Sequence, residues 1–126
     1  MAYLVDTDVL IDVSRDKEAA IEFLDQLDDF WLVSIITAME LMVGARNQQE
    51  VSEIDQLVAV YSVIPLAAEI GATAYRLLKK FAKSHGLRVF DSLIAATAIE
   101  ENLTLVTRNK KHFQMIDSLK LEIPGY

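Results

Sequence analysis

Short runs of consecutive apolar residues alternate along the chain with longer segments in which apolar positions recur every three or four residues. The short runs predict buried strands, because a strand covered on both faces has no polar positions to alternate with. The longer segments predict helices with one buried side. The predicted strands cover residues 2–5, 30–35, 63–65, 103–106 and 120–123, and the predicted helices begin near residue 8 and cover residues 17–27, 37–46, 49–61, 67–84, 91–101 and 110–115.

This alternation predicts an α/β fold of three layers, in which an open parallel sheet of about four or five strands has helices on both faces. The segment 91–101 is apolar nearly all round, so we expect it to be a buried helix. No repeat and no Pro/Gly/Ser-rich linker divides the 126 residues, which predicts a single domain, 1–126. Ligands of such sheets bind at the carboxyl ends of the strands, near the point where the strand order reverses.

Composition narrows the possible classes of protein. Hydrophobic residues make up 52% and charged residues 25% of the chain, which excludes a disordered polymer. The absence of cysteine excludes disulfides and thiolate zinc sites and favours a reducing cytoplasm. The longest nearly continuous apolar stretch, residues 30–45, contains Glu40 and is shorter than the ~20 residues of a membrane span, and no signal peptide is expected. The two histidines, His85 and His112, do not form a zinc-hydrolase motif.

The charge is unevenly distributed. The net charge is −7, which by itself argues against a polyanionic partner. Residues 1–75, however, hold 14 acids and 3 bases, whereas residues 76–126 hold 5 acids and 9 bases. A basic flank beside an acidic pole would follow, and a mixed solvated surface is an equal alternative. Four bases cluster on one side of the predicted helix 67–84, at Arg76, Lys79, Lys80 and Lys83.

Three acids and a threonine stand where the predicted strands end. Asp6 follows the first strand, Glu40 lies one helical turn past the second, Asp91 opens the buried helix, and Thr107 ends the strand 103–106. We expect all four at the same sheet edge. Each acid also has a purely structural interpretation: Asp6 and Asp91 as helix N-caps, and Glu40 as the acid of a capping box with Thr37.

The apolar neighbours of these acids favour a shared chemical role. Acids are seldom buried without a partner, and close carboxylates in a partly dry cleft repel one another by roughly 4 kcal/mol per pair. A divalent cation removes this repulsion. Oxygen ligands without histidine or cysteine select Mg²⁺, or Mn²⁺ as its substitute.

Four segments place these residues in longer motifs, in order along most of the chain: Leu4–Ile11, Ser34–Leu41, Gly86–Ala98 and Leu105–Phe113. Together they resemble the motifs of PIN-domain ribonucleases, and within that family those of the VapC toxins of type II toxin–antitoxin pairs. The resemblance implies a PIN-like fold and a metal-dependent endoribonuclease with Asp6, Glu40 and Asp91 as metal ligands. Many members carry a fourth acid where this chain has Asn109, which can ligate through its carbonyl oxygen but adds no charge.

The resemblance also implies a mechanism. A Mg²⁺-activated water attacks the scissile phosphate of RNA and leaves a 5′-phosphate and a 3′-hydroxyl. Thr107, and with it Thr7 or Asp8, would hydrogen-bond the ligands or the phosphate. His112 and Phe113 are expected to pack rather than to catalyse. Four bases would contact the RNA backbone, with plain surface charge as the alternative for each: Arg88, Arg108, Lys110 and Lys111.

Partners follow from the same resemblance. Proteins of this type form homodimers, and a cognate VapB-type antitoxin wraps across the protomer. An acidic pocket at Asp6, Glu40 and Asp91 would attract an arginine or lysine of the antitoxin when metal is absent. No membrane partner is expected.

Two other functions stay open on the sequence. In a haloacid-dehalogenase-like phosphatase, Asp6 would be the nucleophile and Asp8 the general acid. After Thr107 only Asp117 and Glu122 remain for the late acidic pair of that class, and 126 residues is short for its fold. Glu40 and Asp91 would also be left without roles. The second alternative is a non-catalytic PIN-like module that only binds RNA, for which the three intact acids have no use.

Overall fold

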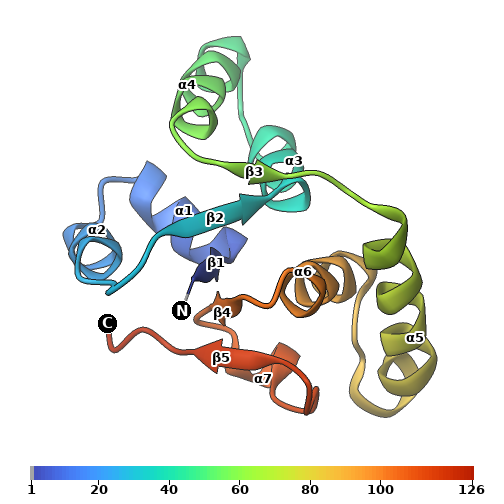
Figure 1. Cartoon of the computed structure of the whole chain (residues 1–126). Coiled ribbons are helices and arrows are strands. Elements are labelled where there is room, and N and C mark those ends of the chain that lie inside the picture. Colours follow the sequence, from blue (N-terminus) through green and yellow to red (C-terminus); the bar gives the residue numbers. More distant parts are fainter. Residues whose placement is uncertain (1) are drawn as a thin grey trace.

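A computed structural model describes residues 2–126 and contains one sheet of five strands, all parallel. The strands lie in the order β3-β2-β1-β4-β5, so the order reverses between β1 and β4 (Figure 1). This confirms the predicted open parallel α/β sheet. The strands are β1 (Tyr3–Val5), β2 (Trp31–Ser34), β3 (Val63–Ile64), β4 (Thr104–Val106) and β5 (Lys120–Glu122).

Seven helices connect these strands within the described residues, and each lies within a few residues of a predicted one. Helices α1 and α2 lie on the opposite side of the sheet from α5 and α6 (Figure 1). No helix between residues 2 and 126 is both long and apolar enough to cross a bilayer. The helices are α1 (Thr7–Ser14), α2 (Glu18–Asp25), α3 (Ile35–Val43), α4 (Gln48–Ala59), α5 (Ala68–His85), α6 (Val89–Glu100) and α7 (Lys110–Phe113).

Alternate residues of the two central strands face two hydrophobic clusters. Leu4 and Leu105 pack with side chains of α5, α6 and α7, whereas Val5 and Val106 pack with side chains of α1 and α2. All four side chains are fully buried. Because successive strand residues point to opposite faces and both faces are covered, β1 and β4 read as unbroken apolar runs.

The starts of α3 and α6 differ from the sequence prediction. Helix α3 begins at Ile35 rather than Thr37, and the side chain of Ser34 caps it by accepting from Ile36 N at 3.0 Å. The predicted capping box of Thr37 and Glu40 is therefore wrong, and that alternative for Glu40 falls away. Helix α6 begins at Val89.

Two of the proposed helix caps can now be decided. Arg88 occupies the N-cap position of α6, so Asp91 lies in the first turn and is not the cap. Asp6 does occupy the N-cap position of α1, and its side chain accepts from Thr7 N. The structural interpretation of Asp6 is thus correct, without excluding a second role. Helix α6 is buried as predicted, since Ser92 and residues 94–98 are buried.

Gly86 ends α5 with a φ of +70° and donates from its N–H to Ala82 O. A side chain in this left-handed conformation is strained, so Gly86→Ala is expected to lower the free energy of unfolding by about 1 kcal/mol. Gly71 is the matched control, because it lies inside the same helix and an added Cβ meets nothing within 4 Å. Gly71→Ala is expected to raise stability by about 0.5–1 kcal/mol. Urea unfolding measures both changes, and equal effects would contradict this account of Gly86.

Candidate active site

Asp6 lies directly after β1, at the point where the strand order reverses, and only 4% of its surface is exposed. Its backbone N–H donates to Val106 O of β4 at 2.9 Å. One carboxylate oxygen accepts from Thr7 N at 2.7 Å, and the other accepts from the buried hydroxyl of Thr107, also at 2.7 Å. Val106 at the end of β4 therefore holds the backbone of Asp6, and Thr107, which follows it, holds the carboxylate.

The environment of Asp6 disfavours its negative charge. Burial, followed by the charge of Asp8, raises the pKa of Asp6 from 3.8 to about 7, and the charge of Asp91 adds to the shift. The hydrogen bonds from Thr107 and Thr7 act in the opposite direction. Asp8 and Asp91, whose charges raise this pKa, are themselves carboxylates. The site therefore holds negative charge that a cation would stabilise.

Glu40 reaches the site from α3 through a threonine. Thr7 Oγ1 donates to Glu40 Oε1 at 2.6 Å and lies 3.0 Å from Thr37 Oγ1. Because Thr7 directly follows Asp6, this hydrogen bond joins the start of α1 to the second turn of α3. Glu40 is half-buried, and its position is set by tertiary contacts rather than by helix capping.

Asp91 lies in the first turn of α6, near enough to Asp6 for its charge to act on it. Burial raises its pKa, and the neighbouring His112 and Arg88 partly offset this effect. His112 Nδ1 lies 3.3 Å from Asp91 Oδ2. These three side chains line a small cavity of about 30 Å³ together with His85, Gly86 and Leu87.

The predicted metal ligands are not equally close to one another. The charge of Asp91 acts on Asp6, whereas Glu40 is linked to Asp6 only through Thr7. Between residues 2 and 126, no three His, Asp or Glu side chains lie close enough to hold one ion. The structure thus brings Asp6, Asp91, Glu40 and Thr107 to one sheet edge without closing them into a metal cage.

Asp8 and Asn109 flank this site. One carboxylate oxygen of Asp8 accepts from Val9 N at 2.8 Å, and the other accepts from Arg108 N at 3.0 Å. Asn109 donates from its backbone N–H to Thr107 Oγ1 at 3.1 Å, and its side chain does not cap α7. The hydroxyl of Thr107 thus connects the chain around Asn109 to Asp6.

The four bases predicted to bind RNA lie in different surroundings. Arg88 is exposed beside Asp91, and Lys110 and Lys111 are exposed on α7. Arg108 instead forms an ion pair with Asp12 at 3.0 Å. Its guanidinium also lies 4.8 Å from the centre of the Tyr126 ring. The positive charge of Arg108 is therefore compensated locally, unlike an open phosphate-binding arginine.

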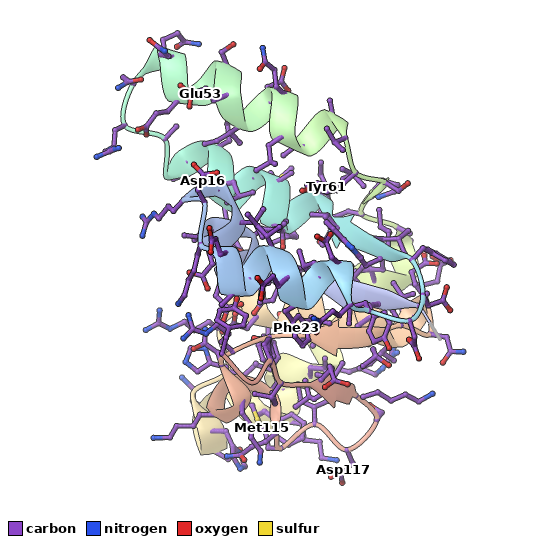
Figure 2. The ribbon with its side chains drawn as sticks, turned by 90° about the vertical axis from the view of Figure 1, so that its left-hand side faces the viewer. Asp16, Phe23, Glu53, Tyr61, Met115 and Asp117 are labelled. Atoms are coloured by element: carbon purple, nitrogen blue, oxygen red, sulfur yellow. The ribbon has the colours of Figure 1, made fainter. Side chains whose placement is uncertain are left out.

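A groove of about 750 Å³ runs from Glu40 between α1, α3 and α4. Figure 2 shows Asp16, after the end of α1, and Glu53 of α4, which line it from two sides. Apolar side chains also line it, among them Ile11, Leu41, Ile54 and Leu57. The groove offers both apolar area and acidic groups to a partner.

Similarity to known proteins agrees with this geometry. Residues 3–118 match the PIN domain. The chain belongs to the PIN domain family. It is similar to ribonuclease VapC10 of Mycobacterium tuberculosis, with 34% identity over 98% of this chain and 96% of the relative. The sequence-based assignment to the VapC group of PIN domains is therefore confirmed.

Solved structures share the fold over nearly the whole chain. A toxin–antitoxin complex from Klebsiella pneumoniae matches with a TM-score of 0.81 and 29% identity, over 97% of both chains. VapBC2 from Rickettsia felis, bound to a DNA fragment from its promoter, matches with a TM-score of 0.83 and 28% identity, over 98% of both chains. The PIN-like fold predicted from the motifs is thus confirmed.

Sequence reasoning missed two parts of the site. His112 was expected only to pack, but its side chain is half exposed and contacts Asp91, whereas Phe113 is fully buried as expected. The signal was present, since His112 belongs to the same motif as Thr107. The contact of Asp12 with Arg108 and with the hydroxyl of Tyr126 at 2.9 Å left no signal, because 114 residues separate Asp12 from Tyr126.

Proposed function

We propose that this PIN domain protein is an endoribonuclease toxin that cleaves RNA and is neutralised by a cognate antitoxin. The observation that carries the proposal is the environment of Asp6. This carboxylate is buried at the point where the strand order reverses, and its raised pKa means that a cation would stabilise its charged form. Full-length similarity to a VapC ribonuclease supports RNA as the substrate. Neither alternative has comparable support.

The phosphatase alternative conflicts with the position of Asp8. A general acid must present its carboxyl group to the leaving group of the substrate. Both oxygens of Asp8 instead accept backbone hydrogen bonds, from Val9 and from Arg108. Family membership also argues for the PIN assignment over this class.

We propose Mg²⁺, with Mn²⁺ as substitute, as the cofactor. Asp6, Asp91 and Glu40, with Asn109 as a further oxygen donor, would hold it after their side chains move towards the ion, since no three acidic side chains of residues 2–126 meet at one point as they stand. The donor set fits a hard cation, because carboxylate and amide oxygens are its preferred ligands and the pKa values of Asp6 and Asp91 are raised. When bound, such an ion polarises the phosphate and lowers the pKa of a water molecule. The protein contributes ligand position: Thr107 orients Asp6, and Thr7 orients Glu40.

Substrate binding is assigned to the exposed bases around this edge. Arg88 lies beside Asp91, and Lys110 and Lys111 follow Thr107 along the chain, so all three can meet the phosphates that flank the cleaved bond. We retain Arg108 as a fourth contact, for which the phosphate must compete with Asp12. Phosphate contacts of this kind position RNA without selecting a sequence.

We further propose a homodimer and an antitoxin partner in the cytoplasm. Several large apolar side chains near the site are more than half exposed, which gives a second copy area to bury: Met39, Val43, Val89 and Phe90. A basic antitoxin side chain would be attracted to the carboxylates at Asp6 and Asp91. The related structures are toxin–antitoxin complexes. The cysteine-free composition fits a reducing compartment.

The test is incubation of the purified protein with total RNA and Mg²⁺, followed by mapping of the cut ends. Cleavage that EDTA abolishes and Mn²⁺ restores is the expected result. Expression without the antitoxin is expected to arrest growth, and light scattering is expected to give the mass of a dimer. Intact RNA together with hydrolysis of a small phosphomonoester would overturn the proposal in favour of a phosphatase.

Restoring a fourth acid is expected to tighten metal binding. Asn109→Asp adds a negative charge next to Thr107, and we expect Mn²⁺ affinity to rise about 10-fold, a change of ~1.4 kcal/mol. Isothermal titration calorimetry measures this change, with Asn102→Asp, at an exposed turn after α6, as the matched control. Unchanged affinity in Asn109→Asp would remove Asn109 from the set of ligands.

A further inference from the structure

The segment from residue 70 to residue 90 has a charge opposite to that of the whole protein. It contains five bases and no aspartate or glutamate, in a chain whose net charge is −7. Most of this segment is α5, the longest helix among the described residues. The excess charge is therefore carried by one rigid element.

The bases of α5 share one side of the helix with an aromatic ring. Lys79, Lys80 and Lys83 are exposed, and Tyr75 is 66% exposed, although it is a large aromatic residue. At 3.6 residues per turn these four positions fall within less than half of the circumference. The opposite side carries the residues that face the core, Ile70, Ala74 and Phe81 among them. We call the exposed side chains of Tyr75, Lys79, Lys80 and Lys83 the α5 ridge.

The lysines of the α5 ridge are not neutralised by acids. Within residues 2–126 none of the three forms an ion pair with a carboxylate. Two of them lie instead over aromatic rings, with Lys79 Nζ 5.6 Å from the centre of the Tyr75 ring and Lys80 Nζ 5.3 Å from that of Phe81. Uncompensated lysines beside an exposed tyrosine match what single-stranded nucleic acid requires, namely cations for phosphates and a ring for a base.

The α5 ridge leads to the proposed site of cleavage. Helix α5 ends at Gly86, and His85 and Gly86 line the small cavity that also contains Arg88 and Asp91. From Tyr75 to Lys83 the ridge extends about 12 Å along the helix axis. Figure 1 shows α5 on the outer side of the molecule, with α6 between it and the sheet. A single strand of nucleic acid that lies along α5 would therefore pass Arg88 as it approaches Asp91.

We propose that the α5 ridge binds the backbone of single-stranded RNA on one flank of the cleaved bond, with a base stacked on Tyr75. This inference rests on the proposed function for the identity of the polyanion. RNA is favoured over an acidic protein because the ridge combines an exposed ring with lysines and continues to the candidate active site. None of the residues of the α5 ridge is among the bases already assigned to substrate binding. The proposal therefore predicts that long RNA binds more tightly than short RNA.

The test measures binding apart from cleavage. Fluorescence anisotropy follows a labelled oligouridylate of roughly 20 nucleotides in EDTA, between ~50 and ~200 mM salt. The ridge variant is Lys79→Gln/Lys80→Gln/Lys83→Gln. The control variant, Arg15→Gln/Lys17→Gln/Lys120→Gln, has the same change of net charge at bases outside α5. Circular dichroism verifies that both variants are folded.

The ridge variant is expected to flatten the slope of log affinity against log salt by about 2, because each lost contact with single-stranded nucleic acid contributes ~0.7. The control variant is expected to leave the slope nearly unchanged. Tyr75→Ala is expected to weaken binding about five-fold, and Tyr75→Phe, which keeps the ring, is expected to bind normally.

Equal slopes for the ridge and control variants would overturn the proposal, because the effect would then be one of overall charge. A ridge variant that binds RNA normally but loses binding to polyglutamate would assign the ridge to an acidic protein, and would also overturn it. A different result would contradict the proposed function without contradicting the ridge. If the unaltered protein binds oligouridylate through the ridge but leaves RNA intact with Mg²⁺ and Mn²⁺, the nuclease assignment is wrong and the ridge remains.

Discussion

Asp6→Asn is expected to lose RNA cleavage by about 1000-fold, since loss of a charged metal ligand costs several kcal/mol in the transition state. The same variant is expected to be more stable than the unaltered protein in metal-free buffer at pH 8. The side chain is buried, and the pKa of its carboxyl group is raised to about 7, so its ionised form opposes folding. Activity and stability should therefore move in opposite directions.

The sign of the pH dependence follows from proton binding. Between pH ~4 and pH ~7 the folded protein keeps a proton on Asp6 that the unfolded chain has released, so this group lowers stability as pH rises through that range. Asp6→Asn removes this decline, and we expect a gain of about 2 kcal/mol at pH 8, because asparagine keeps only part of the hydrogen bonding.

Thermal unfolding at pH 4 and pH 8, with and without Mn²⁺, measures the effect. Mn²⁺ is expected to stabilise the unaltered protein and to leave Asp6→Asn nearly unchanged. Asp117→Asn is the matched control, at an exposed aspartate that precedes the start of β5 (Figure 2). Full cleavage activity in Asp6→Asn, or equal stabilisation of both proteins by Mn²⁺, would contradict the role of Asp6 as a ligand.

Thr107→Val is expected to lower both stability and activity. The hydroxyl of Thr107 is fully buried, donates to Asp6 and accepts from Asn109 N. Valine has nearly the same shape but removes the hydrogen bond to the buried carboxylate of Asp6, and a buried polar group that loses its partner costs about 1–3 kcal/mol. Cleavage is expected to fall about 10–100-fold, the range for residues that orient metal ligands.

Thr107→Ser separates the hydroxyl from the packing of the methyl group. Serine keeps the hydrogen bond that lowers the pKa of Asp6, so its pH–activity profile is expected to match that of the unaltered protein. Thr107→Val removes this bond, and its profile is expected to move to higher pH. If the serine and valine variants lose equal activity with the same profile, Thr107 contributes only packing.

The positions of β1 and β4 were predictable because both strands lie between two hydrophobic clusters. Leu4 and Val5 have different neighbours, yet both are apolar, so the run is visible without knowledge of the topology. Helix starts were harder. Ser34 and Thr37 both qualify as caps in sequence, and the choice of Ser34 depends on where β2 ends and on the burial of Thr37.

The composition of the site was predictable, but its connections were not. Residues that follow parallel strands meet at one edge, which is enough to place Asp6 and Thr107 together. The hydrogen bond from the Thr7 hydroxyl to Glu40, by contrast, depends on how α1 packs against α3. The ion pair between Arg108 and Asp12 likewise joins segments whose proximity no local pattern encodes.

The late position of β4 in the sequence determines when the candidate active site can be completed during synthesis. Strand β4 pairs with β1, but Thr107 lies 101 residues after Asp6. A ribosome has therefore made nearly the whole chain before this pair can form, and the unfinished chain has no completed centre. Long-range parallel pairing is also a slow step of folding. The candidate active site is therefore completed only late in synthesis, after the segments that carry Asp6 and Glu40 have already been made.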